Sequence, residues 1–361
     1  MNSILWLPTP PSFGSVSMQR YFGALSEEVE RKKANGQDEY HIRPVVPYTG
    51  LMVGSKSRIY RAFDKWYYFK WRVARAGEHD LVHALAHGSG HLLPYLKGKP
   101  KTIATIHDLI PLRFAGGLTP AQLERFKKQT ERLIQFDLLT TVSEFTANEV
   151  VELTSIPRSQ IRVVQNGIDR ELFRQVVPLP AEISHLAGKP YVLSVSSAIE
   201  RKNLKIFPEV FAEVFSKEPE LKLVRVGSLF PVELKERFEK LCGKDKLIEL
   251  GRVDDEALVP LFQQAKVFFF PSLYEGFGLP VIESMASGCP VVCSNTTSIP
   301  EVGGDAALYF DPTDAEAGAA GILEALSDSD RMVANGIEHS RAYSWKNTLE
   351  GHLSCYKELL E

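Results

Sequence analysis

Short apolar runs alternate along the chain with segments in which apolar residues recur at helical spacing. Strands that alternate with helices are typical of a mainly parallel sheet covered by helices on both faces. Phe268, Phe269 and Phe270 are apolar at consecutive positions, so we expect both faces of that strand to be buried. The runs that predict strands are 3–7, 40–46, 80–85, 101–106 and 138–143 in the first half, and 191–196, 221–227, 247–251, 266–272, 290–294 and 307–310 in the second. The pattern therefore predicts an α/β protein with doubly wound sheets.

Chain length and one proline-bearing stretch predict two domains. At about 100 to 200 residues per domain, 361 residues suffice for two, each with its own core. Residues 161–180 end a strand at an Asn166-Gly167 turn and continue into a stretch with two prolines, which we interpret as the linker. We place the domains at residues 1–172 and 173–344, and we expect a last helix, 345–361, to return to the first domain.

Composition excludes several classes of protein. With 44% hydrophobic and 24% charged residues, the sequence is that of an ordinary globular protein and not of a collagen-like, disordered or disulfide-stapled one. No apolar run approaches the roughly 18 to 20 residues of a transmembrane helix, and the opening residues lack the features of a signal peptide. The four cysteines form neither close pairs nor a zinc-like pattern, which predicts a reducing, cytoplasmic location.

Positive charge is concentrated in the first half of the chain. Residues 1–175 hold 24 Lys and Arg against 17 Asp and Glu, whereas residues 176–361 hold 18 against 28. Residues 56–75 interleave basic and aromatic residues, a pattern that suits the interface of an anionic membrane. An amphipathic helix packed into its own domain is the alternative, and the absence of a nucleic-acid-binding module argues against nucleic acid as a partner. The residues that we expect at a membrane are Arg58, Arg61, Lys65, Trp66 and Arg72.

The strongest candidate for chemistry is the loop after the strand 266–272. Ligands of doubly wound sheets bind at the carboxyl ends of the strands. This loop contains two glycines and leads to Pro280, a residue favoured at the start of a helix, so the backbone N–H groups there form a phosphate site without a lysine. Glu275 precedes this helix, and we place Glu283 in its first turn. Carboxylates repel a diphosphate, so we expect sugar hydroxyls as their partners.

The segment 274–312, YEGFGLPVIESMASGCPVVCSNTTSIPEVGGDAALYFDP, closely resembles the donor site of the retaining glycosyltransferases of family 4, which have the GT-B fold. Glu275 and Glu283 form the E-x7-E pattern of that family. The resemblance covers essentially the whole chain and includes TIHDLIPLRF (105–114), TTVSEFT (140–146), VVQNGID (163–169) and SVSSAIERKNL (194–204). It implies two Rossmann-like domains that face each other across a cleft. The chain is similar to bacterial mannosyltransferases of surface-polysaccharide synthesis.

The resemblance also implies roles for residues of the second half. Glu275 would bind hydroxyls of the transferred sugar, Glu283 the ribose, and Lys202 the leaving phosphate, with Arg201 beside it. Many members of the family have an Arg where this chain has Ser197, which leaves fewer cations for the phosphate. The other donor-binding positions are the amides of Phe277, Gly278 and Leu279 at the diphosphate and the backbone of Arg252 and Val253 at the nucleobase.

In the first half, the resemblance assigns a histidine and a glycine loop. His107 follows the strand 101–106 and matches the family's histidine, which reaches toward the sugar and the β-phosphate. Gly14 and Ser15 stand where the family has a Gly-Gly loop beside the donor phosphate and the acceptor. Only one of those two glycines is present here.

Two patterns resemble metal sites, but the residues around them argue against this. Histidines recur every four residues from 79 to 91, yet two glycines interrupt any helix that would align them. Asp328 and Asp330 form a D-x-D pattern, but it follows a helix instead of a strand, and we interpret it as a capping turn. We therefore expect neither a metal nor another cofactor.

These features predict a retaining, metal-independent glycosyltransferase. We expect it to move a hexose, with mannose from GDP-mannose as the best guess, from a nucleotide-sugar to a polysaccharide or polyprenyl-linked acceptor. The first domain would bind the acceptor and the second the donor, at the inner face of the cytoplasmic membrane. Departure of the nucleoside diphosphate leaves an oxocarbenium-like sugar that the acceptor attacks from the same face. A GT-B nucleotide-sugar epimerase or hydrolase and a weakly active, partner-binding subunit remain as alternatives.

Overall fold

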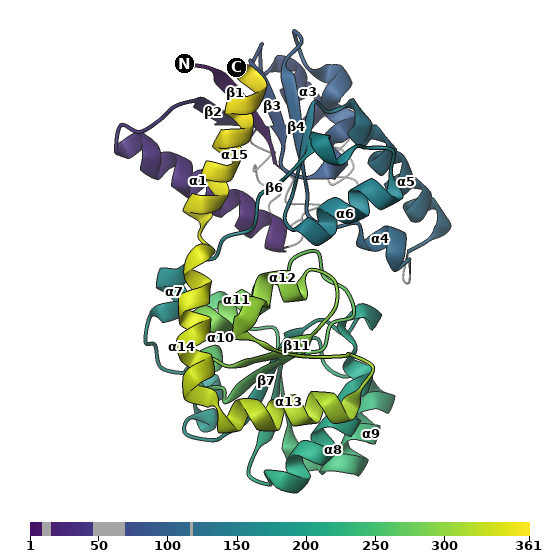
Figure 1. Ribbon diagram of the computed structural model, residues 1–361, viewed down its shortest axis with the longest axis vertical. Coiled ribbons are helices and arrows are strands. Elements are labelled where there is room, and N and C mark those ends of the chain that lie inside the picture. Colours follow the sequence, from purple (N-terminus) through teal and green to yellow (C-terminus); the bar gives the residue numbers. More distant parts are fainter. Residues whose placement is uncertain (9–15, 46–68, 116–117) are drawn as a thin grey trace. The chain divides into compact units, whose positions relative to one another are not determined.

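The computed structural model describes residues 1–8, 16–45, 69–115 and 118–361, which form two compact units (Figure 1). The first unit contains residues 1–167 together with 345–361, and the second contains residues 168–344. Each unit has one six-stranded sheet in which all neighbouring strands run parallel. The α/β class and the doubly wound sheets predicted from the sequence are confirmed.

The sheet of the first unit has the strand order β2-β1-β3-β4-β5-β6. Because the order reverses between β1 and β3, the carboxyl ends of these two strands form the switch point at which such sheets bind ligands. The strands are Ser3–Leu7 (β1), His41–Pro44 (β2), Leu81–Ala84 (β3), Lys101–Ile106 (β4), Leu138–Thr141 (β5) and Ile161–Val163 (β6). The first five of these strands lie within the runs that predicted them, and β6 is the strand expected at the start of residues 161–180.

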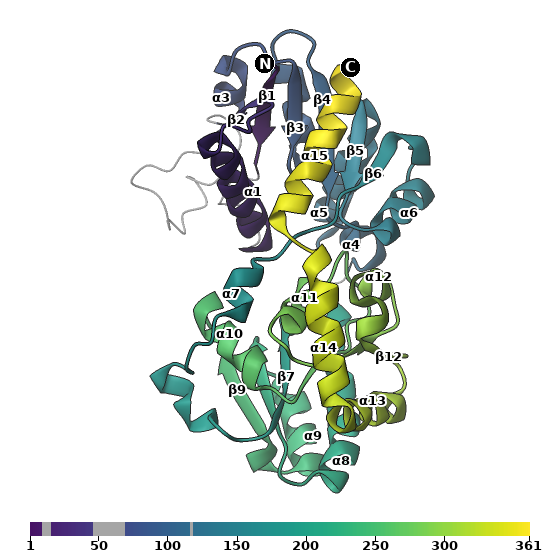
Figure 2. The same ribbon diagram turned by 60° about the vertical axis from the view of Figure 1, so that its left-hand side comes forward.

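The last helix of the chain completes the core of the first unit. Trp345–Leu360 (α15) packs beside Val16–Ala34 (α1) on one face of the sheet, as Figure 2 shows. Leu349 and Tyr356 of α15 are buried there against Trp6 of β1. The other helices of this unit are Phe69–Arg75 (α3), Ile110–Arg113 (α4), Pro120–Glu131 (α5) and Glu144–Leu153 (α6).

A chain of hydrogen bonds crosses this core from α15 to the sheet. Trp6 Nε1 donates to the Tyr356 hydroxyl at 2.9 Å, and that hydroxyl lies 2.6 Å from His83 Nδ1. His83 Nε2 lies 2.8 Å from Thr105 Oγ1. The indole N–H can only donate, so the Tyr356 hydroxyl accepts from Trp6, whereas the proton of the contact between Tyr356 and His83 can lie on either partner. Burial lowers the pKa of His83 well below its usual value, which favours the neutral ring.

The sheet of the second unit has the strand order β12-β11-β10-β7-β8-β9. Read from β9, this is the 3-2-1-4-5-6 order of dinucleotide-binding sheets, and its switch point lies between β7 and β10. The loops after these two strands carry Lys202 and Glu275. The strands are Tyr191–Ser196 (β7), Lys222–Gly227 (β8), Leu247–Gly251 (β9), Val267–Phe270 (β10), Val291–Ser294 (β11) and Leu308–Phe310 (β12).

Helices cover both faces of the second sheet. Phe269 packs in the cluster formed with α8, α9 and α13, whereas the ring of Phe268 contacts that of Phe262 on α10 at 5.2 Å between centroids. Both faces of β10 are therefore buried, as predicted. The helices are Arg170–Arg174 (α7), Phe207–Lys217 (α8), Val232–Cys242 (α9), Asp255–Gln264 (α10), Leu279–Ala286 (α11), Ile299–Gly303 (α12), Ala315–Ser327 (α13) and Ser329–His339 (α14).

Several predicted residues lie outside the described part of the chain. These are the glycine-loop pair Gly14 and Ser15 and the membrane candidates Arg58, Arg61, Lys65 and Trp66. Within the described ranges, no helix has both the length and the hydropathy needed to cross a membrane.

Candidate active site

The structure brings Lys202 and Glu275 together at the switch point of the second sheet. Lys202 Nζ forms an ion pair with Glu275 Oε1, and Arg201 Nη1 lies 2.9 Å from Glu275 Oε2. The three side chains are largely buried, with exposed fractions of 17% for Arg201, 11% for Lys202 and 10% for Glu275. Residues predicted to have separate roles, at the sugar and at the phosphate, thus form one charged cluster.

Hydrogen bonds fix the two loops that carry this cluster. The Arg201 carbonyl accepts from the amide of Leu273 at 2.7 Å, and Arg201 Nη1 donates to the Tyr274 carbonyl at 2.9 Å. The loop after β11 contributes as well, because Thr297 Oγ1 accepts from the Glu275 amide at 3.2 Å and Ser298 Oγ lies 2.9 Å from the Glu275 carbonyl. The sequence analysis assigned no role to Thr297 and Ser298. Their position shortly after the end of a strand could have indicated that they lie near the site.

The cluster is a net positive site. Burial by itself raises the pKa of Glu275, but the charges of Lys202 and Arg201 outweigh burial and bring its pKa below the usual value. Burial lowers the pKa of Lys202, and Glu275 compensates only in part. With Glu275 ionised, two cations and one carboxylate leave a charge of +1 in a partly dehydrated position. Such a position favours an anionic ligand.

Helix α11 supplies neutral donors next to the cluster. Gly278, which precedes the helix, has φ of +102°, a conformation that strongly favours glycine. Among the described residues, nothing accepts a hydrogen bond from the amides of Phe277, Gly278 and Leu279. Unsatisfied amides at a helix start bind phosphate oxygens well.

The position of Glu283 in the helix differs from the prediction by one residue. Because α11 begins at Leu279, Glu283 is its fifth residue and not part of its first turn. Its side chain is buried, with 4% of the residue exposed.

The remaining donor-binding candidates lie at the same edge of the sheet. Ser197 follows β7 directly and is exposed. Arg252 and Val253 follow β9, which is separated from β7 by β8, so they lie two strands away from Lys202. The structure therefore places them near the candidate site without bringing them into the charged cluster.

Arg225 on β8 is a buried cation that sequence reasoning missed. Its guanidinium donates to Ser196 Oγ at 3.0 Å and to the Ser228 carbonyl at 3.1 Å, and it lies 5.1 Å from the centre of the Phe230 ring. Burial lowers its pKa to about 10. The available signal was a charged residue within the apolar run LVRVG, residues 223–227. Arg225 holds together the ends of β7 and β8, next to Ser197.

His107 lies at the carboxyl end of β4 in the first unit. Its Nε2 is 3.0 Å from the Leu85 carbonyl, which can only accept, so Nε2 carries the proton and Nδ1 is an acceptor. The ring also meets that of Tyr21 edge-on at 4.7 Å between centroids. Burial lowers the pKa of His107 to about 4. At neutral pH His107 is thus an uncharged acceptor suited to a hydroxyl group.

The two sequence patterns that resemble metal sites have structural explanations. His79 precedes β3, His83 lies on β3, and the other two histidines of this series lie in a 3-10 helix at His87–Tyr95, so they share no α-helix. Asp328 immediately precedes α14 and pairs with Arg331. Within the described residues, no group of His, Cys, Asp and Glu side chains gathers in a metal-binding arrangement.

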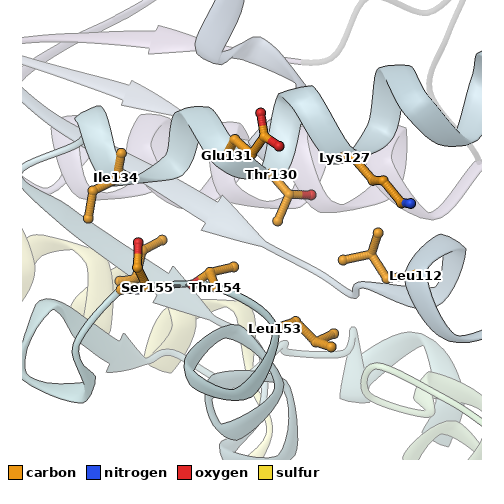
Figure 3. A pocket seen from close by; sticks show the side chains of 9 residues that line it. Leu112, Lys127, Thr130, Glu131, Ile134, Leu153, Thr154 and Ser155 are labelled. Carbon is orange, nitrogen blue, oxygen red and sulfur yellow. Dashed lines mark hydrogen bonds between the residues drawn. The ribbon is translucent and has the colours of Figure 1, made fainter.

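A cavity of about 450 Å³ in the first unit lies between α4, α5 and α6 (Figure 3). The hydroxyl groups of its two threonines donate to backbone carbonyls four residues earlier in the chain. Thr130 donates to the Phe126 carbonyl at 3.0 Å, and Thr154 donates to the Val150 carbonyl at 2.5 Å. None of the predicted site residues that the structure describes lines it. It is therefore a mainly apolar hollow separate from His107.

Comparisons with known proteins identify the family of this chain. Two family models match, Glycosyltransferase Family 4 over residues 24–172 and Glycosyl transferases group 1 over residues 179–341. The O-antigen chain mannosyltransferase B of Escherichia coli is 31% identical over 78% of this chain and 76% of that protein. The serotype-specific mannosyltransferase WbdA of Escherichia coli is 29% identical over 78% of this chain, which spans only 37% of that longer protein.

Solved structures show the same fold at lower identity. A sucrose-phosphate synthase from Thermosynechococcus elongatus gives a TM-score of 0.75 at 20% identity, with 99% of both chains covered. The Anabaena protein HepE, in complex with UDP and glucose, gives 0.72 at 16% identity over 99% of this chain and 100% of that one. The fold is thus GT-B, and the chain belongs to glycosyltransferase family 4.

Proposed function

We propose that this glycosyltransferase moves mannose from GDP-mannose to a polysaccharide or polyprenyl-linked acceptor, with retention at the anomeric carbon. The charged cluster of Arg201, Lys202 and Glu275 beside the amides that precede α11 carries the proposal. It combines a net positive charge and free donors for a diphosphate with a carboxylate for sugar hydroxyls. Similarity to mannosyltransferases of Escherichia coli supports mannose as the sugar.

Each group has a distinct task in the proposed reaction. Lys202 and the amides of Phe277, Gly278 and Leu279 stabilise the negative charge that grows on the departing diphosphate. Glu275 accepts hydrogen bonds from the transferred sugar, and Glu283 accepts them from the ribose. The role proposed for His107 is that of a neutral hydrogen-bond acceptor for a hydroxyl group. The acceptor hydroxyl then attacks the oxocarbenium-like carbon from the face that the diphosphate leaves, and its proton passes to an oxygen of the departing diphosphate.

Donor identity is tested by thermal unfolding with a panel of nucleotide-sugars. A ligand that binds only the folded state at 100 times its Kd stabilises that state by about 2.7 kcal/mol. We expect GDP-mannose to raise the unfolding temperature more than UDP-glucose or ADP-glucose does, and to be consumed with formation of a glycosidic product. A larger shift with a uridine or adenosine donor would contradict the GDP-mannose assignment.

Activity is expected to survive EDTA, because Lys202, Arg201 and the helix amides carry the leaving-group charge in this mechanism. The measurement is the initial rate of transfer before and after exhaustive chelation, with the same dialysis in metal-containing buffer as the control. If EDTA abolished transfer and Mg²⁺ or Mn²⁺ restored it, the metal-free mechanism would be wrong. Attention would then move to Asp328 and Asp330.

We also propose that the enzyme binds peripherally to the inner face of the cytoplasmic membrane. Support comes from residues 56–75, in which basic and aromatic residues alternate, and from the exposed Trp71 and Arg72 of α3. Cosedimentation with vesicles that contain phosphatidylglycerol tests this. Equal sedimentation with neutral and anionic vesicles, or none with either, would contradict it.

A further inference from the structure

A second cavity of the first unit, with a more strongly charged lining, lies between the edge strand β2 and helix α3. Its volume is about 340 Å³, more than ten times the roughly 30 Å³ that one water occupies and within the range of small-molecule sites. Three arginines line it, Arg43 from β2 and Arg72 and Arg75 from α3. None of the donor-site residues contributes to it.

Strand register and helix periodicity bring these arginines together. Arg43 is paired in register with Leu5 of β1, and Leu5 forms part of the cavity wall. On α3, Phe69 and Val73 are buried four residues apart, which leaves Trp71, Arg72 and Arg75 exposed. The Arg75 guanidinium lies over the Trp71 ring at 4.5 Å from its centre. This contact restrains one arginine before any ligand binds.

The cavity carries positive charge that the described residues do not neutralise. No carboxylate is among its lining residues, and no described carboxylate forms a salt bridge with Arg43, Arg72 or Arg75. His79 adds no charge of its own. Its Nε2 donates to the Ala76 carbonyl at 3.2 Å, its Nδ1 lies 2.6 Å from Ser3 Oγ, and burial lowers its pKa. His79 therefore lines the cavity as an uncharged side chain that two hydrogen bonds hold in place.

We propose that this cavity binds a phosphate ester. Guanidinium groups recognise phosphate oxygens through paired N–H donors, and three of them here approach one cavity from two elements. The group has two possible sources, the head group of an anionic phospholipid or a soluble polyol phosphate. The proposal rests on the proposed membrane association only for the lipid as the source, and it is independent of the donor site.

Two sets of substitutions separate a phosphate site from simple charge attraction. The triple variant R43K/R72K/R75K keeps every charge but removes the planar guanidinium groups with their paired N–H donors. The variant R43Q/R72Q/R75Q removes the charges as well as the guanidinium groups. A matched control, K97Q/K99Q/K101Q, removes three exposed charges elsewhere in the same unit. Thermal unfolding of each variant without ligand checks that the fold is kept.

Binding is measured by cosedimentation with vesicles of phosphatidylcholine containing phosphatidylglycerol, and by calorimetry with glycerol 1-phosphate. We expect the lysine triple variant to bind at least tenfold more weakly in one of these assays, the glutamine variant more weakly still, and the control about as well as the parent. Loss in the vesicle arm alone assigns the site to lipid, and loss with glycerol 1-phosphate shows that a soluble ester suffices.

The proposal is overturned if the lysine variant binds like the parent, if the control loses as much affinity as the arginine variants, or if the parent binds neither probe. Failure here is distinguishable from failure of the proposed transferase reaction. Transfer from GDP-mannose to a water-soluble acceptor reports on the donor site, whichever way the binding assays turn out.

Discussion

Replacing Glu275 by Ala is expected to lower kcat by about a thousandfold, equivalent to ~4 kcal/mol in the activation free energy. The carboxylate is the charged acceptor proposed for hydroxyls of the transferred sugar, and it also holds Arg201 and Lys202 in place. Affinity for the nucleoside diphosphate should stay close to that of the parent, because the cations and the α11 amides remain. Steady-state kinetics and calorimetry with GDP measure the two quantities.

The same substitution has a second, independent signature. Without Glu275, Arg201 and Lys202 become buried cations without a carboxylate, and loss of one partner from a buried ion pair costs about 3 to 5 kcal/mol of stability. We therefore expect the variant to unfold at a lower temperature than the parent. Because its affinity for GDP stays close to that of the parent, GDP should stabilise both proteins by a similar amount.

Glu283→Ala and Glu316→Ala provide the comparison. Loss of the proposed ribose contact of Glu283 should weaken GDP binding by about tenfold or more, since a charge-assisted hydrogen bond contributes roughly 1.5 to 3 kcal/mol. Glu316 is exposed at the start of α13, and its replacement should change neither kcat nor the affinity for GDP. Near-parental turnover of Glu275→Ala would remove this residue from the reaction.

Acidification from pH 6.5 toward pH 4 is expected to destabilise the first unit steeply. His83 and His352 are fully buried, and burial lowers the pKa of His352 to about 3 and that of His83 well below its usual value. In the unfolded chain both titrate near pH 6.5. Below that pH the unfolded state takes up protons that the folded state does not, so the free energy of unfolding falls as pH falls.

Each histidine should contribute a slope of about 1.4 kcal/mol per pH unit in this range and almost none above pH 7. Urea unfolding followed by tryptophan fluorescence between pH 7.5 and 4.5 measures the slope. His352→Gln should make it shallower by one histidine's share, whereas His185→Gln, at an exposed position of the second unit, should leave it unchanged. Identical slopes for parent and His352→Gln would show that His352 does not titrate on unfolding.

Periodicity made the strands and the parallel sheets predictable, because burial on both faces of a strand demands apolar residues at consecutive positions. The contact between Lys202 and Glu275 was not predictable from periodicity, since 73 residues separate them and only the strand order places their loops side by side. The buried position of Arg225 was not predicted either, because its partners lie in other segments of the chain. The hydroxyl and carbonyl groups that make its burial tolerable come from β7 and from the loop after β8.

Glu283 shows that the sequence did not determine the exact first residue of helix α11. The preference of Pro280 for a helix start was recognised correctly, but a proline at the second helical position serves as well as one at the first, and this choice moved Glu283 into the next turn. Local signals thus located the helix but left its first residue uncertain, because several backbone starts satisfy the same preference.

The placement of α15 has a consequence for the order in which the chain folds during synthesis. The second unit is one continuous segment, 168–344, and all of it has left the ribosome before residues 345–361 emerge. The first unit, although its strands are made first, lacks Tyr356 and therefore the partner of Trp6 and His83 until the final helix arrives. We therefore expect the half that is synthesised first to finish folding last, the reverse of the usual order for proteins of several domains.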